Sequence, residues 1–332
     1  MRAIWYEQTG SAHAVLVGGD MPAPVPGPGE VRIKLSASGV NPADCYRRRG
    51  EVPMEFPRVI PDSDGAGTVD QIGPGVSEDW LGTRVWLYNG QRGRAFGTAA
   101  QWIALDARLI APLPDNTPFD AGACLGIPCM TAHRCLFTDG PIAGQTILVT
   151  GGAGAVGHYA VQLAKWAGAR VIATVSSVAK AEHALAAGAD VVLNYRSDNV
   201  AERVLEVTGG IGVDRIVEVD FGGNLDASLK AIRLNGVIAV YASRGNLEPK
   251  LPVSAFMRKN VTLHLVVLNN CPLDARQRAQ LDIVRWLETG RAIHRIAARF
   301  PLERTADAHA EVEKGGKLGT VVVETGSDEA HR

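Results

Sequence analysis

One stretch decides how this chain folds: Thr146-Ile147-Leu148-Val149-Thr150-Gly151-Gly152-Ala153-Gly154-Ala155-Val156-Gly157. Its first five residues are apolar or β-branched and predict a strand, and a G-x-G-x-x-G pattern follows at once. An amphipathic stretch, His158–Ala167, predicts a helix after the turn, and Ala169–Val175 predicts a second strand. A strand, a glycine turn, a helix and a second strand in this order are typical of a dinucleotide-binding βαβ unit.

The three glycines of the pattern have different expected roles. Gly152 makes the tight turn, Gly154 lets backbone amides approach a pyrophosphate, and Gly157 lets the helix pack on the strand. We expect the pyrophosphate to contact the residues from Gly154 through Ala155 and Val156 to Gly157. There the unpaired N–H groups and the dipole of the helix favour an anion.

The end of the second strand indicates which nucleotide binds. A site for NAD places Asp or Glu about 20 residues after the glycines, where the carboxylate accepts the ribose hydroxyl. Here Ser176 and Ser177 end the strand, Lys180 follows, and a strand-like segment before Tyr195 and Arg196 leads to the same sheet edge. Taken singly, Lys180 is more typical of a solvated helix residue, and Tyr195 of a packed ring, than of a phosphate site. Together, beside the missing carboxylate, they suit a 2′-phosphate and predict NADPH as the cofactor.

The composition excludes several classes of function. The 332 residues include 34 Lys and Arg against 35 Asp and Glu, which argues against nucleic acid or an acidic membrane surface as a partner. Every apolar run is shorter than the roughly 20 residues of a membrane helix, and Met1–Glu7 lacks the pattern of a signal peptide. The five cysteines are odd in number and scattered, which is typical of a reduced, cytoplasmic protein.

Two kinds of pattern divide the chain. In the first part, short strand-like runs between Pro and Gly clusters predict a compact β-rich domain; the runs are Val31–Ala37, Gly67–Ile72, Arg84–Tyr88 and Ala100–Leu105. Helical patterns at Asp120–Cys124 and Met130–Leu136 come next. Strands alternating with helices then predict a doubly wound parallel sheet; the strands are Thr146–Thr150, Arg170–Val175, Val191–Leu193, Arg215–Val219, Val237–Tyr241 and Thr262–Val267. A helix at Leu273–Thr289 and a strand at Thr320–Glu324 follow, and we expect this part to return to the first domain.

Several motifs, taken in order, resemble the zinc-free NADPH:quinone oxidoreductases, the zeta-crystallin-like branch of the medium-chain dehydrogenase/reductase superfamily. The resemblance covers nearly the whole chain and includes Gly39–Tyr46 with Arg48 and Gly50, Pro61–Gly67, Gly73–Val76, Gly126–Ala132, the glycine turn, Asn194–Arg196, Ser243–Gly245 and Lys317–Thr320. It implies an α/β fold with two domains. These are a GroES-like β-rich catalytic domain of residues 1–121 and 269–332, and a doubly wound Rossmann nucleotide-binding domain of residues 122–268.

The resemblance also identifies positions where a metal would bind. Zinc alcohol dehydrogenases of this superfamily place a cysteine where this chain has Asn41, and a His-Glu pair where it has Ser63-Asp64. An amide and a hydroxyl cannot replace a thiolate and an imidazole around Zn²⁺, so we expect no metal. Without a Lewis acid, the alkoxide formed from a simple ketone lacks a strong stabiliser. A quinone or conjugated enone spreads the incoming charge over its π-system and is therefore the favoured acceptor.

Individual residues receive roles from the same resemblance. It places Asn41 and Tyr46 beside the nicotinamide and the acceptor, with Tyr46 either donating a hydrogen bond to the developing oxyanion or packing at the domain junction. Catalysis would consist mainly of bringing cofactor and acceptor together. The implied cofactor contacts are Thr131 near the nicotinamide, Gly152, Gly154, Ala155, Val156 and Gly157 at the pyrophosphate, Ser176, Lys180 and Tyr195 at the phosphate, and Asn224, Tyr241, Ala242, Ser243, Arg244, Val266, Val267 and Leu268 along the cleft.

Three functions remain in view. The leading hypothesis is hydride transfer from NADPH to a quinone-type acceptor. The alternative is reduction of an activated C=C bond in an enone, alkenal or enoyl thioester, in which case Arg47–Arg49 could hold the phosphates of a coenzyme A. The non-enzymatic alternative, an NADPH-binding structural or RNA-binding protein, is disfavoured by the balanced charge. The resemblance further implies a homodimer or homotetramer, and it leaves the conformation of residues 220–223 open because they depart from common family members.

Overall fold

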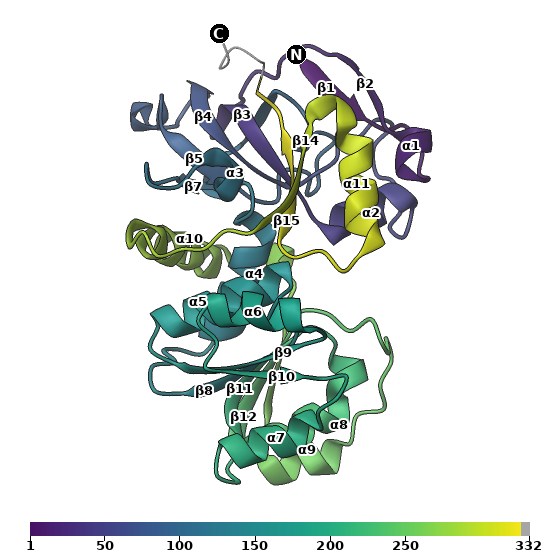
Figure 1. The fold of residues 1–332 in the computed structure, drawn as a ribbon. Helices are drawn as coiled ribbons and strands as arrows, with labels where there is room; N and C mark the ends of the chain where they lie inside the picture. Colours follow the sequence, from purple (N-terminus) through teal and green to yellow (C-terminus); the bar gives the residue numbers. More distant parts are fainter. Residues whose placement is uncertain (327–332) are drawn as a thin grey trace. The chain divides into compact units, whose positions relative to one another are not determined.

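The computed structural model describes residues 1–326, and the contacts within it divide the chain into two compact units (Figure 1). The first unit holds Met1–Ile127 and the chain from Gln280 onward, and the second unit holds Pro128–Ala279. Helix α4 (Gly126–Phe137) runs across the first division and helix α10 (Leu273–Glu288) across the second. The domain boundaries expected from the sequence, after residue 121 and after residue 268, stay a prediction.

A seven-stranded sheet forms the centre of the first unit. Six strands lie in the order β14-β15-β3-β4-β5-β7, and β6 pairs with β3. The pair β14 and β15 is parallel and the others are antiparallel. The strands are β3 (Glu30–Val40), β4 (Asp64–Ile72), β5 (Arg84–Leu87), β6 (Trp102–Asp106), β7 (Ile110–Pro112), β14 (Ile296–Pro301) and β15 (Thr320–Glu324), and a separate antiparallel pair joins β1 (Arg2–Trp5) to β2 (Val17–Asp20).

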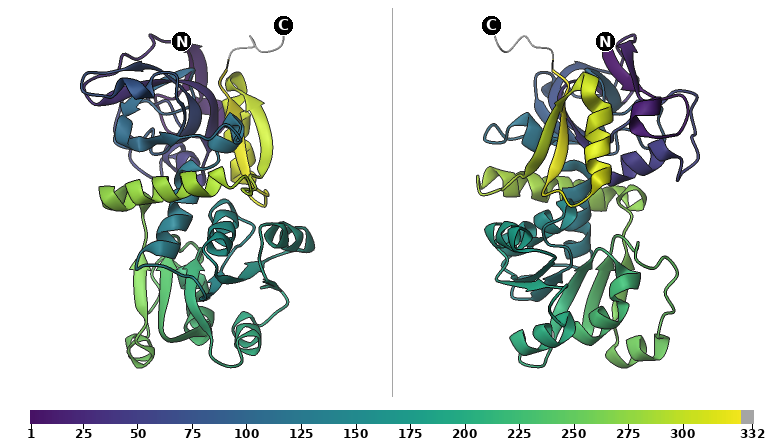
Figure 2. Two further views of the ribbon diagram at one scale, coloured as in Figure 1. Left: turned by 90° about the vertical axis from the view of Figure 1, so that its left-hand side faces the viewer. Right: turned by 45° about the vertical axis from the view of Figure 1, so that its right-hand side comes forward.

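The long strand β3 explains why the C-terminal part of the chain returns to the first unit. Val31, Ile33 and Leu35 alternate along its first half and are buried in one hydrophobic cluster. Its end at Val40 pairs with Val321 of β15, and both residues belong to a second hydrophobic cluster. Figure 2 shows the C-terminal segment, in yellow, lying against the N-terminal part of the same unit. The return expected from the sequence is confirmed.

Short helices cover the sheet of the first unit. They are α1 (Ala12–Val15), α2 (Pro42–Arg49), α3 (Phe119–Gly122) and α11 (Thr305–Lys314), with single 3₁₀ turns η1 (Glu78–Trp80), η2 (Ala107–Leu109) and η4 (Leu302–Arg304). Helix α2 begins with a proline, whose missing N–H has no cost at that position. It ends at Gly50, which adopts the left-handed φ of 93° that glycine tolerates best. Helix α11 packs against α2, β14 and β15.

The second unit is a parallel sheet with helices between its strands. The strand order is β10-β9-β8-β11-β12-β13, so the order reverses between β8 and β11, where doubly wound sheets bind nucleotides. The strands are β8 (Thr146–Val149), β9 (Arg170–Val175), β10 (Val191–Asn194), β11 (Val213–Glu218), β12 (Ile232–Val240) and β13 (Thr262–Leu265). The helices are α5 (Ala155–Trp166), α6 (Val178–Ala186), α7 (Val200–Val207), α8 (Phe221–Ala231) and α9 (Val253–Lys259), followed by the turn η3 (Leu268–Asn270).

The predicted fold class is confirmed, and the predicted strands are found within a few residues. Three helices and strands illustrate the differences in extent. The helix expected at Asp120–Cys124 is α3, which ends at Gly122, and the helix expected at Met130–Leu136 is α4, which begins at Gly126. The strand expected at Val237–Tyr241 is the second half of β12, which begins at Ile232. No sequence pattern predicts β14, because its residues are at best half-buried and its last one is Pro301. Among the described residues, no helix is long and apolar enough to cross a membrane.

Candidate functional site

The turn after β8 forms the first part of the candidate site. Gly151 has the left-handed φ of 65°, and its N–H donates to the hydroxyl of Thr174 (3.1 Å). The Gly152 N–H donates to the Thr174 carbonyl (2.9 Å), and a Cβ on Gly152 would lie 2.7 Å from the Cβ of Ala173. The residue that reverses the chain is therefore Gly151. This corrects the turn role expected for Gly152, which instead allows close packing against β9.

The first turn of α5 presents unpaired backbone amides. Gly154 is the N-cap, and the first helical bond runs from the His158 N–H to the Gly154 carbonyl (2.8 Å). The N–H groups of residues 155–157 therefore have no partner within the helix. A Cβ on Gly157 would lie 2.2 Å from the carbonyl oxygen of Gly151, so a larger residue would force the helix away from the turn. Three amides at the positive end of a helix dipole fit a pyrophosphate.

A polar corner lies at the ends of the neighbouring strands β9 and β10. Lys180 Nζ donates to Ser176 Oγ (3.0 Å), and the hydroxyl of Ser177 caps α6. The Tyr195 N–H donates to the Val175 carbonyl (3.0 Å), and the Tyr195 side chain is 52% exposed. The three residues predicted for the 2′-phosphate thus begin at the same edge of the sheet. A cation and two hydroxyl groups there, without a carboxylate directly after β9, fit a phosphate.

A buried carboxylate that the sequence analysis missed lies at the end of β11. The side chain of Glu218 is fully buried. Its Oε1 accepts hydrogen bonds from the Thr150 hydroxyl (2.9 Å), the Asp220 N–H (2.8 Å) and the Asn224 amide (2.8 Å), and its Oε2 accepts from the Ser228 hydroxyl (2.8 Å). These donors satisfy the carboxylate without a cation. A charged residue directly after the apolar pair Ile216-Val217, at the end of β11, is the signal that could have identified it.

The loop whose conformation the sequence left open is ordered by Asp220. This residue is the N-cap of α8, and its Oδ1 accepts from the Gly245 N–H (2.8 Å). The Gly222 N–H donates to the hydroxyl of Ser243 (2.9 Å), which in turn donates to the Asn246 carbonyl (2.7 Å). The structure therefore brings the start of α8, with Asn224, next to the predicted segment Tyr241–Arg244.

The other cofactor residues predicted in the second unit lie on neighbouring elements. Thr131 is buried on α4. Tyr241 follows β12, and burial raises the pKa of its phenol well above the usual value. The Val266 N–H donates to the Val240 carbonyl (2.7 Å), which places the segment after β13 beside the end of β12. The side chain of Leu268 is buried, whereas that of Val267 is 57% exposed.

In the first unit, Asn41 belongs to a buried polar cluster. Asn41 is 5% exposed, and its side-chain amide donates to Asp64 Oδ2 (2.7 Å), which also accepts from the Ile127 N–H (2.8 Å). The Asn41 N–H donates to Asp44 Oδ2 (2.9 Å), and this bond closes the first turn of α2. Tyr46 lies one helical turn further along α2 and is half-buried, with the Arg49 guanidinium 5.2 Å from its ring centre.

Three consecutive residues, Asp62-Ser63-Asp64, connect this cluster to distant segments. Asp62 Oδ1 lies 3.0 Å from Nε2 of His309 on α11, and Ser63 Oγ donates to Asp44 Oδ1 (3.0 Å). Asp62 has the left-handed φ of 71°, which is unusual for a residue other than glycine. We call Asp44, Asp62, Asp64 and His309 the acid cluster. Sequence patterns predicted none of its bonds, because its members come from three separate parts of the chain.

Burial and mutual repulsion set the protonation states in the acid cluster. Burial raises the pKa of Asp44 to about 6, and the negative charge of Asp62 acts in the same direction. Burial also raises the pKa of Asp64 well above its usual range. For His309, burial alone favours the neutral ring, but the charge and hydrogen bond of Asp62 outweigh it and raise the pKa to about 10. The cluster therefore holds an ion pair, Asp62 with His309, beside an Asp64 carboxyl that takes up a proton more readily than an exposed aspartate does.

The donors at these positions do not fit a zinc ion. The Asn41 amide is bonded to Asp64, and the Ser63 hydroxyl is bonded to Asp44. Neither group supplies the thiolate or imidazole that zinc prefers. Within residues 1–326, no three His, Cys, Asp or Glu side chains are arranged to hold a metal ion.

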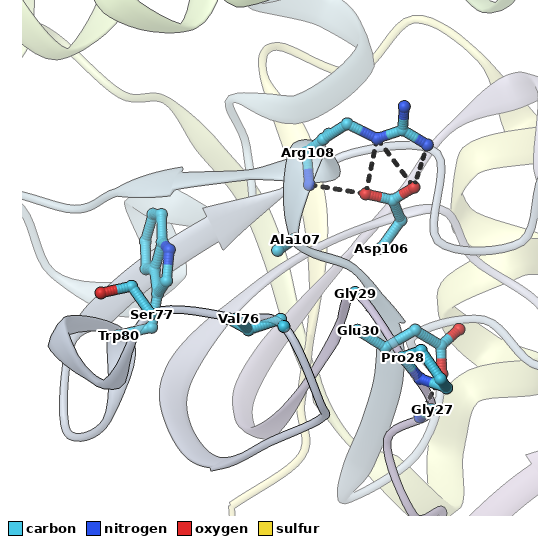
Figure 3. Close-up of a pocket in the computed structure, with 11 residues that line it drawn as sticks. Gly27, Pro28, Gly29, Glu30, Val76, Ser77, Trp80, Asp106, Ala107 and Arg108 are labelled. Atoms are coloured by element: carbon cyan, nitrogen blue, oxygen red, sulfur yellow. Dashed lines mark hydrogen bonds and ion pairs between the residues drawn. The ribbon is translucent and has the colours of Figure 1, made fainter.

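A cavity elsewhere in the first unit is unrelated to the predicted site. It measures about 620 Å³ and is lined by residues of three loops, 27–30, 75–80 and 106–108. Figure 3 shows that Arg108, the cation among them, is paired with Asp106. None of the residues predicted for catalysis or cofactor binding lines it.

Known proteins resemble this chain over nearly its whole length. Residues 27–115 match the alcohol dehydrogenase GroES-like domain, and residues 155–284 match the zinc-binding dehydrogenases. The chain is 32% identical to the quinone oxidoreductase of Mus musculus over 97% of both chains. It is 29% identical to a 2-haloacrylate reductase of Burkholderia sp, over 90% of this chain and 91% of that one.

Solved structures also match this chain over nearly its whole length. A mycobacterial quinone oxidoreductase matches with a TM-score of 0.88 at 32% identity, covering 98% of this chain and 99% of that one. The Escherichia coli quinone oxidoreductase complexed with NADPH matches with a TM-score of 0.84 at 25% identity, covering 98% and 100%.

Proposed function

Because the chain belongs to the zinc-free quinone oxidoreductases of the medium-chain dehydrogenase/reductase superfamily, we propose that it reduces a quinone-type conjugated acceptor with NADPH. The observation that carries the proposal is the set of donors around Asn41. An amide, a hydroxyl and buried carboxyl groups bond one another there, and none is the thiolate or imidazole that would hold a Lewis-acidic zinc ion. The localised alkoxide of a simple ketone would lack a strong stabiliser, whereas a quinone delocalises the incoming charge.

The second unit carries the groups that would hold the cofactor. The amides of residues 155–157 would bind the pyrophosphate, and Ser176, Lys180 and Tyr195 would bind the 2′-phosphate. The contacts between Asp220 and Gly245 and between Gly222 and Ser243 stabilise the segment that we assign to the rest of the cofactor. Bound NADPH supplies the hydride, and the protein supplies its orientation.

Asn41 and Tyr46 are the residues that we assign to the acceptor side of the reaction. The hydrogen bond to Asp64 restricts rotation of the Asn41 amide, so the amide presents a constant face to a bound molecule. The Arg49 guanidinium beside the Tyr46 ring restricts that side chain in a similar way. The phenol of Tyr46 would donate one hydrogen bond to the oxygen on which charge develops.

The alternative, reduction of an activated C=C bond, has one structural observation in its favour. Such a reaction needs a proton for the second carbon, and a donor is most effective when its pKa lies near the working pH. Asp44, whose pKa burial raises to about 6, bonds the backbone of Asn41 and could serve as a proton reservoir. The similarity to a 2-haloacrylate reductase points to the same reaction class.

The deciding experiment is a panel of acceptors assayed by NADPH oxidation after exhaustive chelation of metals. We expect small ortho- and para-quinones to be reduced, with no loss of rate on chelation. Failure to reduce any quinone, together with fast reduction of alkenals or enoyl thioesters, would establish the alternative. Loss of all activity on chelation, restored by zinc, would overturn the metal-free assignment.

We further propose a cytoplasmic location and a homo-oligomeric state. All five cysteines are free thiols, which suits a reducing compartment. The oligomeric state rests on the family resemblance. Size-exclusion chromatography with light scattering tests it directly, and a monomer at working concentration would refute it.

A further inference from the structure

The basic run Arg47-Arg48-Arg49 does not act as one unit. Arg48 is fully buried and bonds Glu313 and the Gly10 carbonyl. Arg49 pairs with Glu51. The side chain of Arg47 makes its one hydrogen bond within the described chain from Nη1 to Gln91 Oε1 (3.0 Å). Its remaining N–H groups are left for solvent or for a ligand.

Arg47 lines a small cavity of the first unit, which we call the Arg47 cavity. Its walls are Tyr6, Arg47, Val59, the loop 52–56 and the loop 91–93, and its volume is about 50 Å³. Two backbone hydrogen bonds between Tyr6 and Val59, each 2.9 Å, fix one wall. This volume corresponds to about three to four water-sized spheres. It is sufficient for the carboxylate end of a small molecule.

The charges around the cavity favour an anion. Arg47 and Arg92 contribute two positive charges and Glu55 one negative charge. Within residues 1–326, neither a hydrogen bond nor an ion pair joins Glu55 to either arginine, and the exposed side chain of Arg92 makes none at all. Burial, followed by the charge of Asp44, raises the pKa of Tyr6 to about 12, so its phenol remains a hydrogen-bond donor at working pH.

Most of the remaining lining is apolar. Val52, Met54 and Phe56 of the loop 52–56 contribute to it. A planar guanidinium binds a carboxylate with two parallel hydrogen bonds, which gives orientation as well as affinity. A guanidinium, a phenol and an apolar wall together match a short carboxylic acid better than an inorganic anion.

We propose that the Arg47 cavity binds the carboxylate of a small acid, and that the acceptor class of this protein includes short α,β-unsaturated carboxylates. The proposal rests on the proposed reduction of conjugated acceptors and adds a site for their anionic end. In the reaction, the π bond of the C=C group is replaced by two C–H bonds. One hydrogen comes from the hydride that NADPH supplies and the other from a solvent proton, and the carboxylate is unchanged.

Equilibrium binding tests the site without requiring turnover. Propionate and crotonate would be titrated into the full chain with NADP⁺ bound and observed by saturation-transfer NMR, with propionamide and crotonamide as neutral counterparts. We expect the acids to bind and the amides to bind at least about tenfold more weakly, because only the acids form charge-assisted bonds. Inorganic phosphate, titrated in parallel, should bind more weakly than either acid.

Variants assign the binding to this cavity. Arg47→Gln should lower the affinity for the acids by about tenfold or more, and Arg47→Lys should restore part of it. Arg108→Gln is the matched control, because it removes a guanidinium from a different cavity of the same unit. If Arg47→Gln fails to fold, Arg92→Gln serves instead, since Arg92 is exposed, with an expected loss of a few-fold.

The possible outcomes test the carboxylate site and the proposed function separately. Acids that bind no better than amides, phosphate that binds as tightly as the acids, or Arg47→Gln and Arg92→Gln proteins with unchanged acid affinity would each overturn the carboxylate site. Quinone reduction would be unaffected by that failure. If the acids bind in an Arg47-dependent way but none of the acceptors tested is reduced by NADPH, the carboxylate site is supported and the proposed function is refuted. With 2-enoate acceptors, Arg47→Gln should raise KM and leave kcat largely unchanged.

Discussion

The two units prepare their candidate sites by different physical means. In the second unit, residues 151–157 form an anion site from backbone amides, and its shape depends on glycines that are close together in the chain. In the first unit, the groups around Asn41 are positioned by side chains, and one of the bonds joins residues 247 positions apart. A backbone site fails when a side chain is added at a crowded glycine. A buried side-chain cluster fails when a distant partner or a proton is changed.

The largest effect is expected from removing the distant partner in the acid cluster. His309→Gln leaves the buried carboxylate of Asp62 without its cation, which typically costs about 3–5 kcal/mol of the free energy of unfolding. His13→Gln is the control, because His13 pairs with Asp307 of the same helix α11 at 2.9 Å but is 64% exposed. Because an exposed ion pair contributes little, His13→Gln should lose less than about 1 kcal/mol of the free energy of unfolding. Equal losses in the two variants, measured by urea unfolding, would mean that the buried pair has no special importance.

The acid cluster should make the free energy of unfolding fall as the pH rises. The pKa of His309 is raised from 6.5 to about 10 in the folded protein, so its stabilising contribution is complete below about pH 6.5 and is lost as the pH rises towards 10. Asp44, with its pKa raised from 3.8 to about 6, also favours the folded state less as the pH rises, but between about pH 4 and pH 6, below the range of His309. Urea unfolding of the wild type should therefore give falling stability from pH 6.5 to pH 10. The His309→Gln protein should show a flatter dependence, and an unchanged slope would contradict this account.

In the glycine turn, the sharpest test is one added methyl group. The Cβ of Gly157→Ala would lie 2.2 Å from the Gly151 carbonyl oxygen, so the start of α5 must shift. We expect a loss of NADPH affinity of roughly 10- to 100-fold, because the shift weakens at least one hydrogen bond to a charged phosphate, worth about 1.5–3 kcal/mol. Gly154→Ala is the matched variant, because its Cβ lies 3.3 Å from the same oxygen and leaves the turn in place, so any loss of affinity there reports crowding of the pyrophosphate. Fluorescence titration with NADPH and urea unfolding measure both variants, and an unchanged free energy of unfolding in Gly157→Ala would refute the assigned packing role.

A smaller effect is expected at the polar corner. Lys180→Ala removes the cation that contacts Ser176 and should weaken NADPH binding by roughly tenfold, because a charge-assisted bond to phosphate is worth about 1.5–3 kcal/mol. Affinity for NADH, which lacks the 2′-phosphate, should barely change. Wild-type protein that binds both cofactors equally would show that this corner does not select the nucleotide.

The smallest effect is expected at Tyr46. Tyr46→Phe removes one hydrogen bond, worth about 1 kcal/mol net, and should slow quinone reduction by a few-fold to tenfold. On an alkenal, a true catalytic proton donor would contribute about 10²–10⁴-fold. Comparing the variant on both acceptors separates a hydrogen-bonding role from proton donation. A loss of several hundred-fold with the quinone would contradict the role proposed here.

How far the sequence predicts the site depends on how local each interaction is. The strand, turn and helix from Thr146 to Ala167 were predictable, because hydrophobic periodicity and glycine positions act within a few residues. The absence of a carboxylate after β9 was equally visible. Within that turn, however, the choice between Gly151 and Gly152 as the left-handed residue was not, since two adjacent glycines satisfy the same pattern.

The α/β class, the nucleotide-binding unit and the residue types that disfavour zinc could be predicted from the amino-acid sequence, because they follow from local periodicity and from the chemistry of single side chains. Which polar groups are partners depends on how distant segments pack. The tertiary structure paired Asp62 with His309, gave the Glu218 carboxylate its four donors, and separated Arg47 from Arg48 and Arg49. Burial then set the protonation of those groups, and burial depends on every element that packs around them.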